Sequence, residues 1–209
     1  PSPDRGGESD SPSPGGRGGR GVRANVIGVI ENQAPTRHLR VEVTPEDGEV
    51  KVDMARDLAK IALVERHRAT GEVKVGLVQG FRFTARGAIA TSVAHDSHHM
   101  IVVGTDERDM ALAANTLAEV QGGQVVVKEG KVTGLVELPI AGLMSNEHAS
   151  RVAQKADTLL QGFREIGCKL NNANMQLSLL ALVVIPELRI SDLGLVDVTT
   201  FGLIPVFET

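Results

Sequence analysis

The densest group of chemically active side chains is a run of five polar residues, which reads His95-Asp96-Ser97-His98-His99. Neutral imidazole and carboxylate groups are the usual ligands of divalent metals. Imidazole also exchanges protons near neutral pH. A metal site and a proton shuttle therefore compete with a plain connecting loop, in which Asp and Ser side chains hydrogen-bond the backbone of turns. Polar loops between apolar strands often carry function, so all three interpretations stay open from the residues alone.

Three more residues could support such a site. Ser92 lies three positions before His95 but outside the Gly-x-Ser-x-Gly pattern that marks a nucleophilic serine. Glu65 and His67 flank Arg66 at the end of an apolar run, from which they could face the same site. A solvated strand end explains the charges of this segment equally well. Ser92, Glu65 and His67 are therefore weaker candidates for the functional site than the residues of the 95–99 loop.

Strands are expected to position these residues. Runs of alternating or continuous apolar residues, rich in Val and Ile and separated by turn residues, predict them. The predicted strands are residues 25–30, 39–44, 50–53, 60–65, 73–78, 88–94, 100–103, 124–128, 131–138, 194–198 and 203–207. The turns between them predict two hairpins, one joining 39–44 to 50–53 and one joining 124–128 to 131–138.

Two main helices and a short one are also predicted. Residues 106–121 carry apolar side chains at spacings of three and four, with Thr105 or Asp106 as the cap and Gly122-Gly123 as the stop. The second helix covers 145–167 from a Ser145 cap, and residues 175–183 form a short buried helix. Helices mixed with hairpins predict an α/β domain, with α+β as the related possibility, built on a mixed sheet.

Composition limits the class of protein. The 209 residues are 42% hydrophobic and carry a formal net charge of −4, which fits a globular core and argues against a nucleic-acid partner. The sequence has no apolar run long enough to cross a membrane, so no membrane partner is expected. One cysteine, Cys168, excludes an internal disulfide, and the lack of a secretory signal favours the cytoplasm.

The first 21 residues differ from the rest. Fifteen of them are Gly, Pro or Ser, and none is aliphatic or aromatic. Such a segment cannot bury enough apolar surface to offset the entropy of ordering, so we expect residues 1–21 to be disordered and 22–209 to form one domain.

Five blocks together resemble the C-terminal region of the bacterial adenine deaminases, which belong to the amidohydrolase superfamily. The blocks are residues 64–71 (VERHRATG), 87–98 (GAIATSVAHDSH), 102–105 (VVGT), 138–145 (LPIAGLMS) and 184–198 (VIPEL through GLVDV). The resemblance runs from about Arg23 to the end of the sequence.

This resemblance implies hydrolysis of adenine to hypoxanthine and ammonia in purine salvage or degradation, at a two-metal centre of manganese or iron. Most metal ligands of that superfamily lie in a (β/α)₈ barrel, and this chain has neither the length for a barrel nor a His-x-His pair. We therefore expect a catalytic barrel domain as a partner, and no activity from the chain alone. The resemblance implies that His95, Asp96 and His98 complete the active site, with His95 and His98 as possible metal ligands. His99 departs from the family pattern, so we expect it to be dispensable.

Two questions stay open at this point. A module that kept the fold and binds or regulates without catalysis is the alternative to an enzyme domain. The apolar hairpins would also suit an interface with a second copy, so a homo-oligomer is expected.

Overall fold

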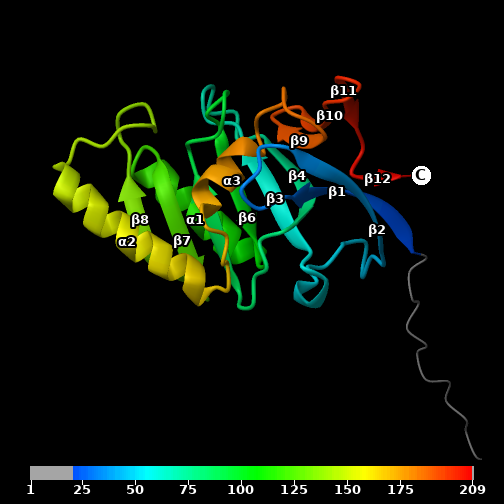
Figure 1. Ribbon diagram of the computed structural model, residues 1–209, viewed down its shortest axis with the longest axis horizontal. Coiled ribbons are helices and arrows are strands. Elements are labelled where there is room, and N and C mark those ends of the chain that lie inside the picture. Colours follow the sequence, from blue (N-terminus) through cyan, green and yellow to red (C-terminus); the bar gives the residue numbers. More distant parts are fainter. Residues whose placement is uncertain (1–20, 209) are drawn as a thin grey trace, which may run out of the picture.

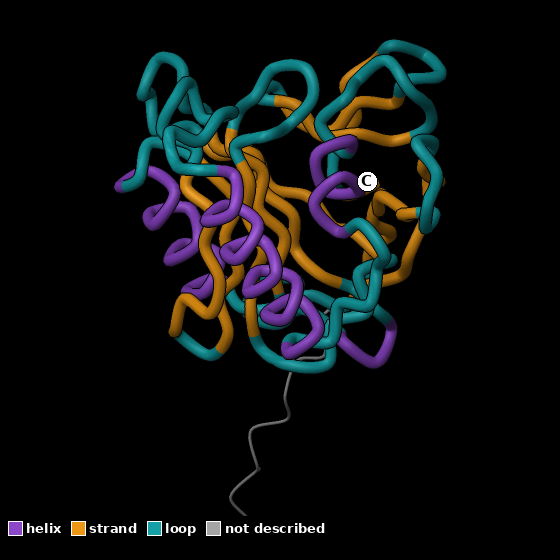
Figure 2. Tube along the Cα trace, turned by 60° about the vertical axis from the view of Figure 1, so that its left-hand side comes forward, coloured by secondary structure: helices purple, strands orange, loops and turns teal. Residues whose placement is uncertain are grey.

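The computed structural model describes residues 21–208, so the prediction of a disordered tail lies, apart from its last residue, outside the described residues. Strands of the described part form a nine-stranded sheet and a separate three-stranded sheet. Figure 1 shows α2 along β7 and β8 at one end of the large sheet, with the small sheet β9–β11 at the other end. Most loops gather at the ends of the strands (Figure 2).

The large sheet is mixed, as predicted. Its order is β12-β1-β4-β3-β6-β5-β7-β8, with β2 paired to β1. The pair β1–β4 is parallel and the other pairs are antiparallel. Its strands are β1 (Val22–Val29), β2 (Thr36–Val43), β3 (Ala59–Val64), β4 (Val73–Gln79), β5 (Gly87–Thr91), β6 (Met100–Gly104), β7 (Gly123–Lys128), β8 (Lys131–Glu137) and β12 (Phe207–Glu208). The small sheet contains β9 (Leu188–Ser191), β10 (Gly194–Asp197) and β11 (Gly202–Ile204).

Helix α1 (Glu107–Glu119) confirms the sequence pattern closely. Its Met110, Ala113 and Leu117 are buried, and the side chain of Asp106 caps it by accepting two backbone N–H bonds. Gly122 and Gly123 both have positive φ, which stops the helix and starts β7. The other helices within residues 21–208 are α2 (Ala149–Glu165), α3 (Ala173–Leu179) and the 3₁₀ turn η1 (Met54–Arg56). None of the helices in this described range is long and apolar enough to span a membrane.

The two faces of the large sheet bury different cores. One face packs against α2, α3 and the small sheet, and its core includes Ile61, Leu159 and Leu195. The opposite face packs against α1 over β5, β6 and β7. A third, smaller cluster lies at β1 and β2, where Val50 and Leu58 cover the sheet. Hairpin β7–β8 lies where predicted and is covered by α2.

The predicted pairing of 39–44 with 50–53 is wrong. Strand β2 instead pairs along its whole length with β1, in the register Val26–Leu39 and Ala24–Val41. That register places the apolar residues of both strands in one cluster. Residues 50–52 form no strand, because Asp53 begins η1 and its side chain accepts the Arg56 amide.

Helix α2 begins later than its predicted cap at Ser145. The segment before it folds into a tight loop closed by two backbone bonds between Ile140 and Met144. The Ser145 hydroxyl accepts the Glu147 amide within that loop, and His148 caps the helix. Strand β9 was not predicted, because its four residues fall in a region where Pro186 suggested only a break.

Strand β9 carries a fully buried arginine. The Arg189 guanidinium donates to the carbonyl oxygens of Ala34, Leu179, Ile185 and Pro186, at 2.6–3.3 Å. Four carbonyls replace water around the cation, so its burial is compensated by hydrogen bonds. This residue ties the turn after β1 to the segment that follows α3.

Candidate functional site

The pairing of β3 with β6 brings the predicted site residues together. These strands run antiparallel with Val64 opposite Met100, so Glu65 follows one strand where His99 precedes the other. The 95–99 loop and the 65–70 turn therefore meet at one end of the sheet. Both segments were candidates from the sequence, but their separation along the chain gave no indication that they lie together.

Glu65 organises its own turn. Its carboxylate accepts hydrogen bonds from the backbone amides of His67, Arg68 and Thr70 and from the Thr70 hydroxyl, at 2.6–3.1 Å. Burial on its own raises the pKa of Glu65, but these hydrogen bonds outweigh it and lower the pKa to about 2. The carboxylate is therefore an ionised anchor for the turn, with its oxygens occupied by donors.

His99 lies at the centre of the cluster. Its side chain is 9% exposed, with Nδ1 at 3.9 Å from Glu65 Oε1 and Nε2 at 3.8 Å from Asp192 Oδ2. Its ring also stacks at a tilt on His67, with 4.6 Å between the ring centroids. Burial, followed by the charge of His67, lowers the pKa of His99. Because Nδ1 faces the Arg66 amide at 3.5 Å, the proton of the neutral ring belongs on Nε2, toward Asp192.

The 95–99 loop is braced from the 65–70 turn. Arg66 Nε donates to the His98 carbonyl at 2.5 Å, and His67 Nε2 bonds the Ser97 carbonyl at 2.6 Å. On the other side, the backbone amide of His95 donates to Ser178 of α3. Within residues 21–208, the half-buried imidazole of His95 and the exposed carboxylate of Asp96 make no side-chain hydrogen bond or ion pair. Two free polar groups are thus presented on a fixed backbone.

Ser92 is placed differently. It is fully buried, its hydroxyl donates to the Gly142 carbonyl at 2.7 Å, and the same oxygen accepts the Gly123 amide at 2.8 Å. Arg66 adds a bond from Nη2 to the Ala141 carbonyl at 2.8 Å. Both hydrogen-bonding directions of the hydroxyl are in use, so Ser92 fixes the 138–144 loop next to the site.

The described residues do not fit a metal centre. His95 and His98 meet edge to face, with 5.7 Å between ring centroids. His98 Nδ1 is buried and has no hydrogen-bond partner, and burial followed by the charge of His95 lowers the pKa of this ring. No third His, Cys, Asp or Glu within residues 21–208 completes a ligand group around them. A protein metal site needs three or four such ligands, so we derive no metal-dependent step from these residues.

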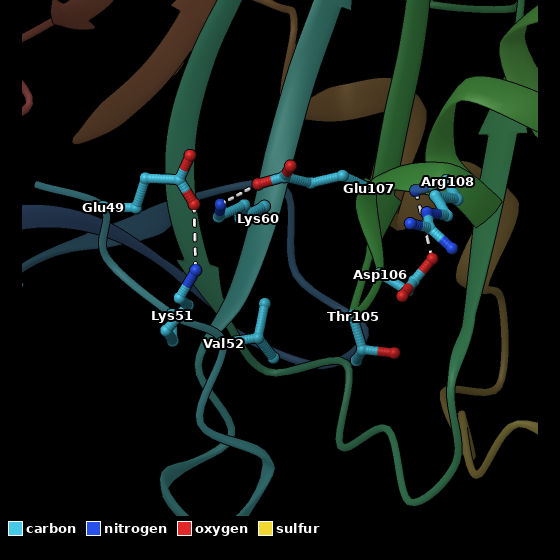
Figure 3. Close-up of a pocket in the computed structure, with 8 residues that line it drawn as sticks. All are labelled: Glu49, Lys51, Val52, Lys60, Thr105, Asp106, Glu107 and Arg108. Atoms are coloured by element: carbon cyan, nitrogen blue, oxygen red, sulfur yellow. Dashed lines mark hydrogen bonds and ion pairs between the residues drawn. The ribbon is translucent and has the colours of Figure 1, made fainter. Parts of the chain in front are cut away.

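A charged hollow at the start of α1 has a different character (Figure 3). Its lysines are already paired, Lys60 with Glu107 and Lys51 with Glu49, and Asp106 caps the helix. These paired charges neutralise one another. The exposed Arg108 also lines the hollow and has no ion pair among the described residues, but a single surface cation does not make a ligand site.

Sequence reasoning missed Asp192. This residue lies in the turn between β9 and β10, and it reaches His99 from a part of the chain that is distant in sequence. The turn residues Ser191-Asp192-Leu193-Gly194 between two apolar stretches indicate a hairpin. They do not indicate that this hairpin lies beside His99. His99, which was predicted to be dispensable, is the imidazole that lies between two carboxylates of the cluster.

The fold and the braced loop define an α+β domain that presents polar groups at one end of its main sheet. The chain belongs to the adenine deaminase C-terminal domain family, which matches residues 33–202. It is 62% identical over 193 residues to an adenine deaminase of Roseobacter denitrificans, a match that covers 92% of this chain. Adenine deaminases of Mesorhizobium japonicum and Moorella thermoacetica are 57% and 46% identical, over 97% and 88% of the chain.

These relatives are much longer than the chain. The match covers 32% of the Roseobacter protein and 33% of the Mesorhizobium protein. The chain thus spans about a third of the length of the curated relatives it matches, and residues 21–208 contain no (β/α)₈ barrel.

Proposed function

We propose that this chain serves as the C-terminal domain of an adenine deaminase. Together with the rest of such an enzyme, it takes part in the hydrolysis of adenine to hypoxanthine and ammonia, in purine salvage or degradation. The observation that carries this proposal is the 62% identity to a protein of that name over 92% of the chain.

The role proposed for this domain is to complete a site built mainly by the other two thirds of the enzyme. His95 and Asp96 are the groups for this role, because their side chains are unengaged while their backbone is braced. An imidazole and a carboxylate at this position can hydrogen-bond a purine or move a proton during deamination. The two-metal centre of manganese or iron is assigned to the portion outside this chain, since the described residues do not supply its ligands.

Exchange of domains tests the function. In a chimera, this chain replaces the matching third of the Roseobacter denitrificans protein, and hypoxanthine formation from adenine is measured with added manganese. We expect an active chimera and no turnover by the chain alone. A folded but inactive chimera would instead support a binding or regulatory module without catalysis. Turnover by the chain alone would show that the other two thirds are not required.

Substitutions in the same chimera test the loop. His95→Ala and Asp96→Ala should each lower kcat/KM by about 100-fold if these groups transfer protons. Ser97→Ala is the matched control, because only the backbone carbonyl of Ser97 makes a loop contact. Circular dichroism checks that each variant is folded. Wild-type rates in both variants would reduce the loop to a structural connection.

A further inference from the structure

One face of the large sheet is incompletely covered. On the side of α1, the helix covers β5, β6 and β7, while Val50 and Leu58 cover the sheet near β1 and β2. Between these two covers lies a strip of β3 and β4. Val73 and Val75 of β4 are 48% and 52% exposed there. Strand β4 pairs with β3 at Val73–Val78 and with β1 at Leu77–Gln79, so these valines are apolar residues on an open face of the sheet. Adjoining exposed apolar side chains of this kind mark a candidate interaction surface.

Three adjacent hollows follow this strip and share lining residues, and together they are called the groove. Their volumes are about 260, 370 and 630 Å³. The first two share Lys60, Val75 and Glu107, and the second and third share Val64. The groove therefore runs beside α1 from its beginning to its end.

The lining changes along the groove. The middle is apolar, with Val73 and Val75 on one side and Ala111 and Ala114 of α1 on the other. Ala118 continues this wall toward the end of the helix. Alanines let a second helix approach closely, and the 13 residues of α1 give the groove a length of about 20 Å. Charges stand at both ends, where Lys60 pairs with Glu107 and where Glu65 and Arg66 line the largest hollow.

The backbone around the groove restricts what can bind. Strand β3 bonds neighbours on both sides, and β4 bonds β3 along Val73–Val78 and β1 only at Leu77–Gln79. The groove lies over the face of these strands beside α1, so an added strand placed in the groove would not reach a free edge. An occupant must therefore lie on the face of the sheet. An amphipathic helix beside α1 suits this position, because it forms its own backbone hydrogen bonds and presents an apolar stripe to the groove. Residues 1–21 cannot be this occupant, because they contain no aliphatic or aromatic side chain.

We propose that the groove binds an amphipathic helix from the two thirds of the enzyme that lie outside this chain. This inference rests on the proposed function, because the occupant comes from the longer polypeptide that the relatives contain. The groove ends at Arg66, whose side chain holds the His98 and Ala141 carbonyls. The docked helix therefore lies next to the turn that braces the 95–99 loop.

Accessibility of a single introduced thiol tests the proposal. The native Cys168 is buried, and burial raises its pKa to about 11, so it does not compete for a thiol reagent. Ala111→Cys places a probe on the exposed wall of the groove, and Ala153→Cys places a control on the exposed side of α2. Each variant is labelled in the chain alone and in the Roseobacter chimera, and labelling at the site is quantified by peptide mass spectrometry.

We expect the thiol of Ala111→Cys to react at least about tenfold more slowly in the chimera than in the chain alone, while that of Ala153→Cys reacts at similar rates in both. Equal rates for the groove thiol would overturn the groove proposal. Cross-linking from the same thiol with a bifunctional thiol–amine reagent should reach residues spaced three or four apart in one segment. Attachment to an extended segment or a loop would contradict a helical occupant.

The same samples distinguish two further outcomes. Slow labelling of the chain alone that depends on its concentration would assign the groove to a second copy and overturn the proposal. Deamination by the chimera is measured in parallel. An active chimera with a reactive groove thiol overturns the groove alone, and an inactive chimera with a protected groove thiol overturns the proposed function alone.

Discussion

Glu65 illustrates how one side chain can be essential to a site without reacting. Its oxygens accept four hydrogen bonds from the turn that it begins, and that turn holds the carbonyls of Ser97 and His98. The sequence showed an acid at a strand end. The hydrogen-bond donors that keep this acid ionised are mainly backbone amides, and a pattern of side chains in the sequence does not reveal them.

The ionised state of Glu65 predicts a pH-dependent contribution to stability. Its pKa is lowered from 4.5 to about 2 on folding, so its contribution is complete above pH 4.5 and is lost as the pH falls toward 2. Glu65→Gln should therefore destabilise the protein most near neutral pH, and the difference from wild type should shrink on acidification. Urea unfolding at a series of pH values from neutral down into the acid range measures this.

Thr70→Val is the companion variant for Glu65→Gln. It removes the hydroxyl that donates to Glu65 and accepts the Glu72 amide, but it leaves the three backbone donors to Glu65, so most of the pH dependence should persist. A difference between wild type and Glu65→Gln that stays constant with pH would contradict the low pKa of Glu65.

Among residues 21–208, Arg189 is the largest fully buried side chain, and its chemistry predicts a large effect on stability. Arg189→Met leaves several buried carbonyls without donors, at about 1–3 kcal/mol for each unsatisfied group. We expect a loss of about 3 kcal/mol or more in the free energy of unfolding, measured by urea titration. Arg68→Ala, at an exposed position, should change it by less than about 0.5 kcal/mol. A small effect of Arg189→Met would mean that water replaces the guanidinium.

At the scale of elements, periodicity predicted most of the fold and turns decided the rest. Spacing of Met110, Ala113 and Leu117 was sufficient for α1, and Glu129-Gly130 for the β7–β8 hairpin. The partner of β2 could not be deduced, because β1 and residues 50–53 are both apolar neighbours in sequence. Only the shared cluster in the folded chain distinguishes them. Similarly, the contact between Asp192 and His99, which are far apart in sequence, depends on how the small sheet packs and not on any local pattern.

The junction of α1 and β7 predicts a steric effect at a glycine. A Cβ at Gly122 would lie 2.4 Å from the Gly142 Cα and 2.9 Å from the Ser92 hydroxyl, in a backbone with φ of +118°. Gly122→Ala should therefore cost about 2 kcal/mol or more, from strain and overpacking together. Gly48 has φ of +84° and open space around it, so Gly48→Ala reports the backbone strain alone, at about 1 kcal/mol. Equal losses in the two variants would exclude a steric contact between the 122 and 142 loops.

At the scale of the whole molecule, one sheet is shared by two cores on opposite faces. Leu117 of α1 and Leu159 of α2 are buried in different clusters, yet β7 contributes Val125 to one and Val126 to the other. The shared strand predicts that the two faces unfold together.

Two alanine substitutions test this cooperativity. Leu117→Ala and Leu159→Ala should each lower the free energy of unfolding by about 2–5 kcal/mol and shift one common transition in calorimetry and circular dichroism. Leu193→Ala, at a side chain that is 69% exposed, should change it by less than about 0.5 kcal/mol. A second transition moved by only one of the buried substitutions would show that the faces unfold separately.

The environment of β1 has a consequence for the order of assembly. β4 pairs with Val26–Gly28 of β1, and β12 pairs beside it with Arg23 and Ala24, so the edge is completed by residues near position 208. Arg189 closes the turn after β1 from a similar distance, through the Ala34 carbonyl. Contacts between such distant parts of a chain form late in folding. During synthesis, the part of β1 at Arg23 and Ala24 would therefore keep an open edge until β12 emerges, which makes this edge exposed to wrong pairing.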